Sequence, residues 1–73
     1  MPDERFIAVD GARLRRLRRE KALSQQDLLR ITGVAQATLS DLERGKRGAR
    51  ASTLRKIAEA LGVEPKELMK EER

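Results

Sequence analysis

The sequence contains no cysteine and no histidine, and Phe6 is its single aromatic residue. Without cysteine, disulfides and thiolate metal sites are excluded, and without histidine the usual zinc and general-base chemistries lose their main residues. One aromatic side chain offers no platform for stacking bases, which argues against sheet-type modules for single strands or RNA. We therefore predict a binding protein without metal or cofactor, and not an enzyme.

Long hydrophobic runs are also missing. The apolar stretch at residues 6–9 is far too short for a signal sequence or a membrane span, and the start MPDERFIAVDG is not a basic leader. We expect a soluble, cytoplasmic chain with no membrane partner.

The sequence is rich in charged residues, and positive ones exceed negative ones. Of 73 residues, 40% are charged, and 17 Lys and Arg against 12 Asp and Glu give a net charge of +5. The sequence pI is near 10.4. This length suits one small domain with a modest core, and the excess of positive charge favours an anionic partner.

Glycines separate short amphipathic segments along the chain. The apolar spacing predicts helices over residues 11–21, 25–32, 35–43 and 51–61, with a short final helix starting at Pro65. Residues 1–10 are predicted as an N-terminal arm or short strand, 11–70 as the helical domain and 71–73 as a C-terminal tail.

Each helix has a predicted buried face and predicted ends. Ser24 and Asp27 form a capping-box pattern, and Gly33 suits a left-handed reversal. The residues expected on the buried faces are Leu14, Leu17, Leu28, Ile31, Leu39, Leu42, Leu54, Ile57, Ala58 and Leu61.

Two apolar segments are open to alternatives. Leu68 and Met69 either cover the core or form an apolar dimer patch. Residues 6–9 form either a frayed arm or a strand that pairs with a partner chain, and a strand or packed segment is the preferred interpretation.

A helix that ends at Gly33, followed by another two residues later, predicts a helix-turn-helix arrangement. In that arrangement the second helix lies in the major groove and presents side chains to base edges, while flanking cations engage phosphate.

Three stretches extend this pattern: LRRLRREKALSQQDL, TGVAQATLSDLERGKR and STLRKIAEALGVEPKEL. Together they resemble the lambda-repressor-like, Cro-type (Xre) helix-turn-helix proteins over about residues 12 to 69. The resemblance implies an all-α, compact four- to five-helix bundle with a central helix-turn-helix that binds operator DNA, usually as a two-fold dimer.

The resemblance also implies residue roles. Gln25 would contact a phosphate and brace Gln36, and Arg18 would form a structural ion pair with Glu43. The residues implied to read bases are Gln36, Ala37, Ser40 and Asp41. The residues implied to bind phosphate are Gln25, Thr38, Arg44, Lys46, Arg47 and Arg50.

Simpler interpretations stand beside these roles. Gln36 is also an ordinary helix former, and Gln25 also suits the first turn of a helix. Asp41 would either accept from a cytosine amine or pair with Arg44, and we favour the ion pair. The cations of residues 44–50 form either a solvated loop or, as we favour, a set of phosphate contacts.

The sequence departs from the family pattern at three positions. Ala22 stands where the family often has glycine at the end of its first helix. Leu29 replaces a usual alanine, and Ala35 replaces a usual Ser or Thr cap, which removes a side-chain cap typically worth about 1 kcal/mol.

The functional prediction is a sequence-specific, double-stranded DNA-binding transcriptional regulator. We expect it to act as a repressor, occupying a pseudo-palindromic operator as a homodimer. The alternative is an antitoxin or anti-regulator module whose main role is to bind a partner protein.

Overall fold

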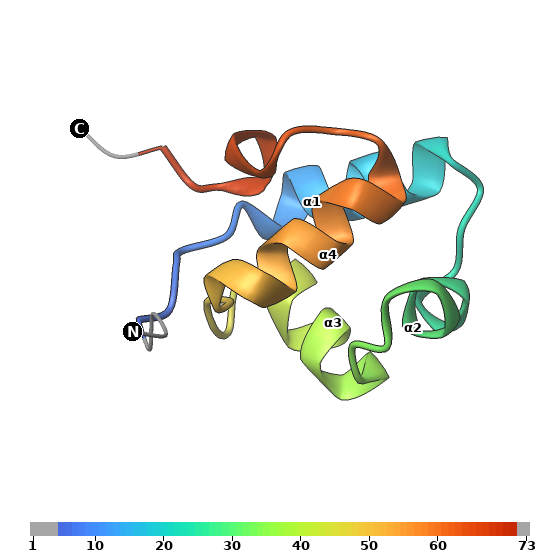
Figure 1. Ribbon diagram of the computed structural model, residues 1–73, viewed down its shortest axis with the longest axis horizontal. Coiled ribbons are helices and arrows are strands. Elements are labelled where there is room, and N and C mark those ends of the chain that lie inside the picture. The colour runs from blue at the N-terminus through green and yellow to red at the C-terminus, as the bar shows by residue number, and fades with distance from the viewer. Residues whose placement is uncertain (1–4, 72–73) are drawn as a thin grey trace.

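The computed structural model describes residues 5–71, along which four α-helices are followed by a short 3-10 helix (Figure 1). The helices are α1 (Gly11–Glu20), α2 (Gln25–Thr32), α3 (Gln36–Glu43), α4 (Ala51–Leu61) and η1 (Pro65–Leu68). The predicted all-α fold is confirmed, and each predicted α-helix is present within one residue of its expected ends. No helix in the described range is long and apolar enough to cross a membrane.

Local hydrogen bonds explain where α2 begins and ends. The Ser24 hydroxyl accepts from the Asp27 backbone amide at 2.9 Å, and the Asp27 carboxylate accepts from the Ser24 amide at 2.9 Å. This reciprocal pair is the predicted capping box, and it satisfies two amides that a helix start leaves free. At the other end Gly33 has φ +76°, the left-handed conformation expected for the reversal into α3.

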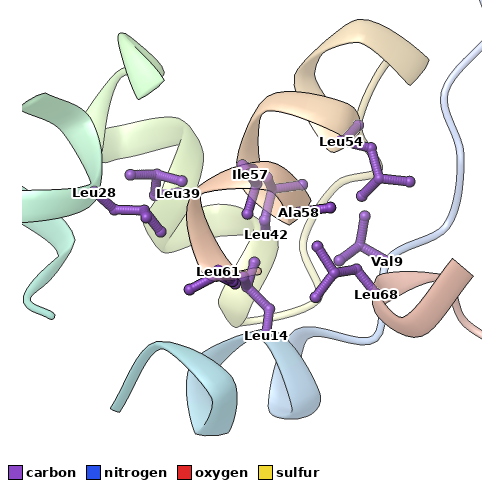
Figure 2. Packing of buried hydrophobic residues seen from close by; sticks show 11 residues of the cluster. Val9, Leu14, Leu28, Leu39, Leu42, Leu54, Ile57, Ala58, Leu61 and Leu68 are labelled. Atoms are coloured by element: carbon purple, nitrogen blue, oxygen red, sulfur yellow. The ribbon is translucent and has the colours of Figure 1, made fainter. Parts of the chain in front are cut away.

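The core is built from one or more aliphatic side chains of every helix. α4 runs through the middle of the fold (Figure 1). Its Ile57 and Leu61 lie beside Leu42 of α3 and Leu14 of α1, whereas Leu54 lies on the side of Val9 and Leu68 (Figure 2). The buried set is Val9, Leu14, Leu28, Leu39, Leu42, Ala49, Leu54, Ile57, Ala58, Leu61 and Leu68.

The prediction for α2 was wrong in one position. Leu28 is buried as expected, but Ile31 is 57% exposed, and Leu29 is the second side chain of α2 that packs against the core. α2 packs on both α3 and α4, so its buried side includes Leu28 and Leu29. Ile31 lies outside this buried side.

The N-terminal segment pairs with two later segments of its own chain. Ile7 forms an antiparallel bridge with Ala49, just before α4, and Val9 forms another with Met69 after η1. Val9 and Leu68 are buried, whereas Met69 is 40% exposed and Phe6 is 53% exposed. Leu68 therefore completes the core, and the segment packs along one side of the domain.

The start of α1 lies directly against the end of α3. At Gly11 a Cβ atom would meet the backbone carbonyl oxygens of Leu42 and Glu43. Since neither carbonyl belongs to a flexible side chain, this contact requires glycine, and it fixes the position of the C-terminal end of α3.

Candidate nucleic-acid interface

α3 presents a polar, small-residue face to solvent. Leu39 and Leu42 anchor its opposite side in the core. Residues 37, 40, 41 and 44 follow the three- and four-residue spacing of one helical face, on which Ala37 and Arg44 are exposed and Ser40 and Asp41 are half-buried. Gln36 is exposed at the first position of the helix. One accessible face of α3 and its edge thus carry all four residues predicted to read bases: Gln36, Ala37, Ser40 and Asp41.

A groove borders α3 on its α4 side. Thr38 of α3 lines it together with Arg47 and Arg50 of the connecting loop. Thr53 and Lys56 line it from α4. This groove therefore brings together three of the predicted phosphate contacts, which come from two separate stretches of the chain.

A second groove borders α3 on the side of α1 and α2. It is lined by Ser40 of α3 and by Arg44 directly after α3. Gln25 lines it from the start of α2, and Arg15 lines it from α1. Gln25 and Arg44, both predicted phosphate contacts, therefore lie on this side. Lys46 is exposed in the loop that follows α3 and lines neither groove.

The cations beside α3 do not form ion pairs with acids in the part of the chain that the structure describes. Within residues 5–71, none of the ion pairs involves Arg15, Arg44, Arg47, Arg50 or Lys56. Unpaired guanidinium and ammonium groups thus border the polar face of α3 on both sides.

The predicted ion pair between Arg18 and Glu43 is present, and it links α1 to the end of α3. Arg18 Nε donates to Glu43 Oε2 at 2.6 Å, and Arg18 Nη2 donates to Oε1 at 3.0 Å. Arg18 Nη1 also donates to the carbonyl oxygen of Leu23 at 2.8 Å. The two side chains are only 10% and 4% exposed. One arginine therefore connects α1, the end of α3 and the loop before α2.

The charge state of this pair follows from its surroundings. Burial raises the pKa of Glu43, but hydrogen bonds from Arg18 and Gln25 and the charges of Arg18 and Arg15 outweigh it, so the pKa lies below its usual range. The hydrogen bond with Glu43 raises the pKa of Arg18 in spite of burial. Both groups are charged at neutral pH.

Two predicted side-chain contacts are not formed as expected. The Gln25 amide nitrogen donates to Glu43 Oε1 at 3.2 Å, so the side chain is used at the ion pair and not to brace Gln36. Asp41 forms no ion pair with Arg44 in the described range. Arg44 follows the last residue of α3 and lines the groove together with Arg18 and Gln25, whereas Asp41 does not line it.

Sequence reasoning missed two cations of this surface. Arg15 of α1 has no role predicted from the sequence, yet it lines the groove beside Ser40 and Arg44. Its position three residues before Arg18 places it on the same side of α1, which was the available clue. Lys56 was not considered, because nothing local to α4 indicates that its N-terminal half borders the start of α3.

The turn before α3 lacks the usual side-chain cap. Ala35 occupies the N-cap position with φ −56° and ψ 143°, and no side chain accepts a hydrogen bond from the first amides of the helix. The start of α3 therefore presents uncapped backbone amides next to Gln36.

Comparison with known proteins agrees with this geometry. A family model described as helix-turn-helix matches residues 14–68, from α1 through η1. The chain belongs to the helix-turn-helix family. The helix-turn-helix match includes the ion pair and the groove on the side of α1 and α2. The groove on the α4 side is also lined by Phe6, which lies before the start of the match.

Individual helix-turn-helix relatives cover most of the chain. An uncharacterised transcriptional regulator, y4dJ of Sinorhizobium fredii, is 46% identical over 59 residues, which are 81% of this chain and 77% of that protein. The restriction-modification controller protein C.AhdI of Aeromonas hydrophila has 41% identity and a TM-score of 0.76, covering 81% of this chain and 89% of its own. The P22 c2 repressor, solved in complex with a synthetic operator, has 27% identity and a TM-score of 0.79 over 85% of this chain and 94% of its own.

Proposed function

We propose that this protein is a transcription regulator that binds duplex DNA with α3 in the major groove. The observation that carries the proposal is the polar, small-residue face of α3, bordered on both sides by cations that form no ion pair in the described range. A helix in the major groove has a phosphate backbone on each side, so it needs positive charge on both of its flanks.

The cations on each side of α3 are placed to bind the phosphate backbone on that side of the major groove. Arg47, Arg50 and Lys56 lie on the α4 side, and Arg15 and Arg44 lie on the other side. The major groove is about 12 Å wide and admits one helix. Binding through these cations releases counterions, which makes the affinity fall steeply with salt.

Base reading is assigned to the exposed face between the flanks. Gln36 suits adenine, because its amide donates to N7 and accepts from the N6 amine, and Ala37 suits the methyl group of thymine. Ser40 and Asp41 complete the set. Asp41, with no ion pair in the described structure, suits the cytosine amine, which donates to a carboxylate.

We further propose that two copies bind a pseudo-palindromic operator, as the resemblance to two-fold repressors implies. If the dimer is symmetric, the two copies of α3 enter successive major grooves about 34 Å apart on one side of the duplex. The P22 c2 repressor, to which the chain is similar in fold, is solved on a synthetic operator. Repression then follows from occupation of a promoter site.

The deciding experiment selects bound duplexes from a random library at about 0.15 M salt, where weak phosphate-only binding is screened. We expect a pseudo-palindromic consensus, with half-sites about one helical turn apart. Selection with the Gln36→Ala variant identifies the base pair that Gln36 reads. No consensus, with binding that disappears as salt rises, contradicts the proposal and favours a module that holds a protein partner.

A further inference from the structure

The single aromatic side chain of the protein lies beside two of the cations assigned to phosphate. Phe6 is 53% exposed, so its ring is accessible at the surface. Its ring centroid lies 5.8 Å from Cζ of Arg47 and 5.5 Å from Cζ of Arg50. Both distances are within the range of cation–π attraction.

Backbone contacts hold Phe6 in this place. The neighbouring Ile7 amide donates to the Ala49 carbonyl at 2.7 Å, and the Ala49 amide donates back to Ile7 at 2.9 Å. At Gly48 a Cβ atom would come within 2.6 Å of the Ile7 oxygen and 3.3 Å of Phe6 Cβ. The N-terminal segment and the loop before α4 therefore lie in direct backbone contact, which places Phe6 beside this loop.

The contact leaves the arginines able to bind an anion. A guanidinium held against an aromatic face keeps its N–H donors available around its edge, where a phosphate oxygen accepts them. Without the ring, Arg47 and Arg50 are exposed, flexible side chains of like charge in one short loop. Binding would then have to order both side chains against their mutual repulsion.

We propose that Phe6 is a positioning residue, which holds Arg47 and Arg50 beside α3 in the arrangement that binds one DNA backbone. This inference rests on the proposed function. It adds to the interface a residue that lies before the helix-turn-helix match, which begins at residue 14.

The test is the Phe6→Leu variant, which keeps an apolar side chain and removes the ring. We expect Phe6→Leu to weaken binding to the selected duplex and to unrelated duplexes alike, by about two- to fivefold for each arginine contact. Phe6→Tyr, which keeps the ring, should bind like the unaltered protein. Met69→Leu, a change at an exposed apolar residue that lines neither groove, is the matched control.

A double substitution separates positioning from a general effect on folding. In a background with Arg47→Ala and Arg50→Ala, we expect Phe6→Leu to cause no further loss of affinity, because the side chains it positions are gone. In the free protein, NMR should show upfield shifts of the arginine side-chain protons that Phe6→Leu abolishes. Thermal unfolding should change little, because the ring is half exposed.

The outcomes are distinguishable. If the unaltered protein binds duplex DNA and Phe6→Leu binds equally well, the inference is overturned and the proposed function stands. An equal loss from Phe6→Leu with and without the two arginines also overturns it, because the ring then acts by another route. If the unaltered protein binds no duplex, the proposed function fails and the inference fails with it.

Discussion

Arg18 of α1 and Glu43 at the end of α3 form a two-point ion pair, with N–O distances of 2.6 and 3.0 Å, beneath the polar face of α3. The Gln25 amide adds a third hydrogen bond to the same carboxylate. The position of α3 therefore depends on a buried charge pair as well as on apolar packing.

Breaking this pair should destabilise the protein strongly. We expect Arg18→Met to lower the free energy of unfolding by about 3–5 kcal/mol, because it leaves the Glu43 carboxylate buried without its cation. That loss is comparable with the total stability of about 5 kcal/mol typical of small domains. Urea unfolding monitored by circular dichroism measures the change.

The matching control replaces both partners. Arg18→Met with Glu43→Leu leaves no buried charge, so we expect it to recover most of the lost stability. A double variant as unstable as Arg18→Met would show that the ion pair is not the cause of the loss.

Acid should weaken the fold through Glu43. Its pKa is below the usual glutamate range in the folded protein, so the unfolded chain takes up a proton first as the pH falls. The contribution of Glu43 is complete above the unfolded value of about 4.3 and is lost as the pH falls through the lower folded value.

Urea unfolding between about pH 6 and about pH 2 tests this dependence. We expect the unfolding free energy of Glu43→Gln, though lower at neutral pH, to fall less over this range than that of the unaltered protein. Hydrogen bonds from the Ser24 backbone and side chain also lower the pKa of Asp27, but both proteins share this effect. Parallel pH profiles would contradict the role assigned to Glu43.

Ala22 is a position at which glycine should be better. It has φ +57°, the left-handed region that costs an L-residue roughly 1–2 kcal/mol. Part of the gain is offset by the greater freedom of glycine in the unfolded chain. We expect Ala22→Gly to raise the free energy of unfolding by about 0.5–1 kcal/mol and the melting temperature by a few degrees.

The control for Ala22→Gly is the same change inside a helix. Ala60→Gly in α4 should instead destabilise the protein by about 1 kcal/mol. If both variants lowered the melting temperature, strain at Ala22 would not be significant.

The start of α3 can be stabilised by restoring a cap. Ala35 already has the extended conformation of an N-cap residue but makes no side-chain cap hydrogen bond. We expect Ala35→Ser to raise the free energy of unfolding by about 1 kcal/mol, because its hydroxyl accepts from a free amide of α3. Thermal unfolding measures the gain, and Ala35→Val, which has no acceptor, should show none.

Substitutions on the two parts of the interface should have different effects on DNA binding. Gln36→Ala should relax specificity at one base pair, by about 1–3 kcal/mol. Lys46→Ala should weaken binding to all sequences and reduce the salt slope by about one. Binding titrations on matched and mismatched duplexes at several salt concentrations separate the two effects.

The control for charge alone is Lys66→Ala in η1, which removes one ammonium group from outside both grooves. We expect it to change affinity less than Lys46→Ala. An equal loss on every duplex for Gln36→Ala would contradict its base-reading role.

Local chemistry made much of this fold predictable. The capping residues Ser24 and Asp27 and the left-handed Gly33 act within a few residues, so their roles follow from the sequence. The i to i+3 spacing of Leu39 and Leu42 likewise identifies the buried side of α3. Ile31 was wrongly predicted to be buried, because its burial depends on contacts with other helices and not on local chemistry. α2 has eight residues, and its neighbours decide which of its apolar residues are covered.

The surroundings of the candidate interface depend on contacts between distant segments. No periodicity in α4 indicates that Lys56 borders the groove with Arg47, and nothing near Phe6 in sequence indicates that its ring meets two loop arginines. The hydrogen bond of Gln25 with Glu43, in place of the expected contact with Gln36, also depends on distant segments. Glu43 lies 18 residues away and is brought close only because α2 packs on α3.

The bridge between Val9 and Met69 has a consequence for synthesis. Helices of 8 to 11 residues are marginal in isolation and depend on packing. Val9 acquires its partner only when residue 69 has emerged. Until then, the core side chains of α1, Leu14 among them, have no η1 to cover them, and the N-terminal segment has only one of its two anchors. Val9 thus stays without this partner until nearly the whole of the domain has been translated, and closure of the fold is a late event.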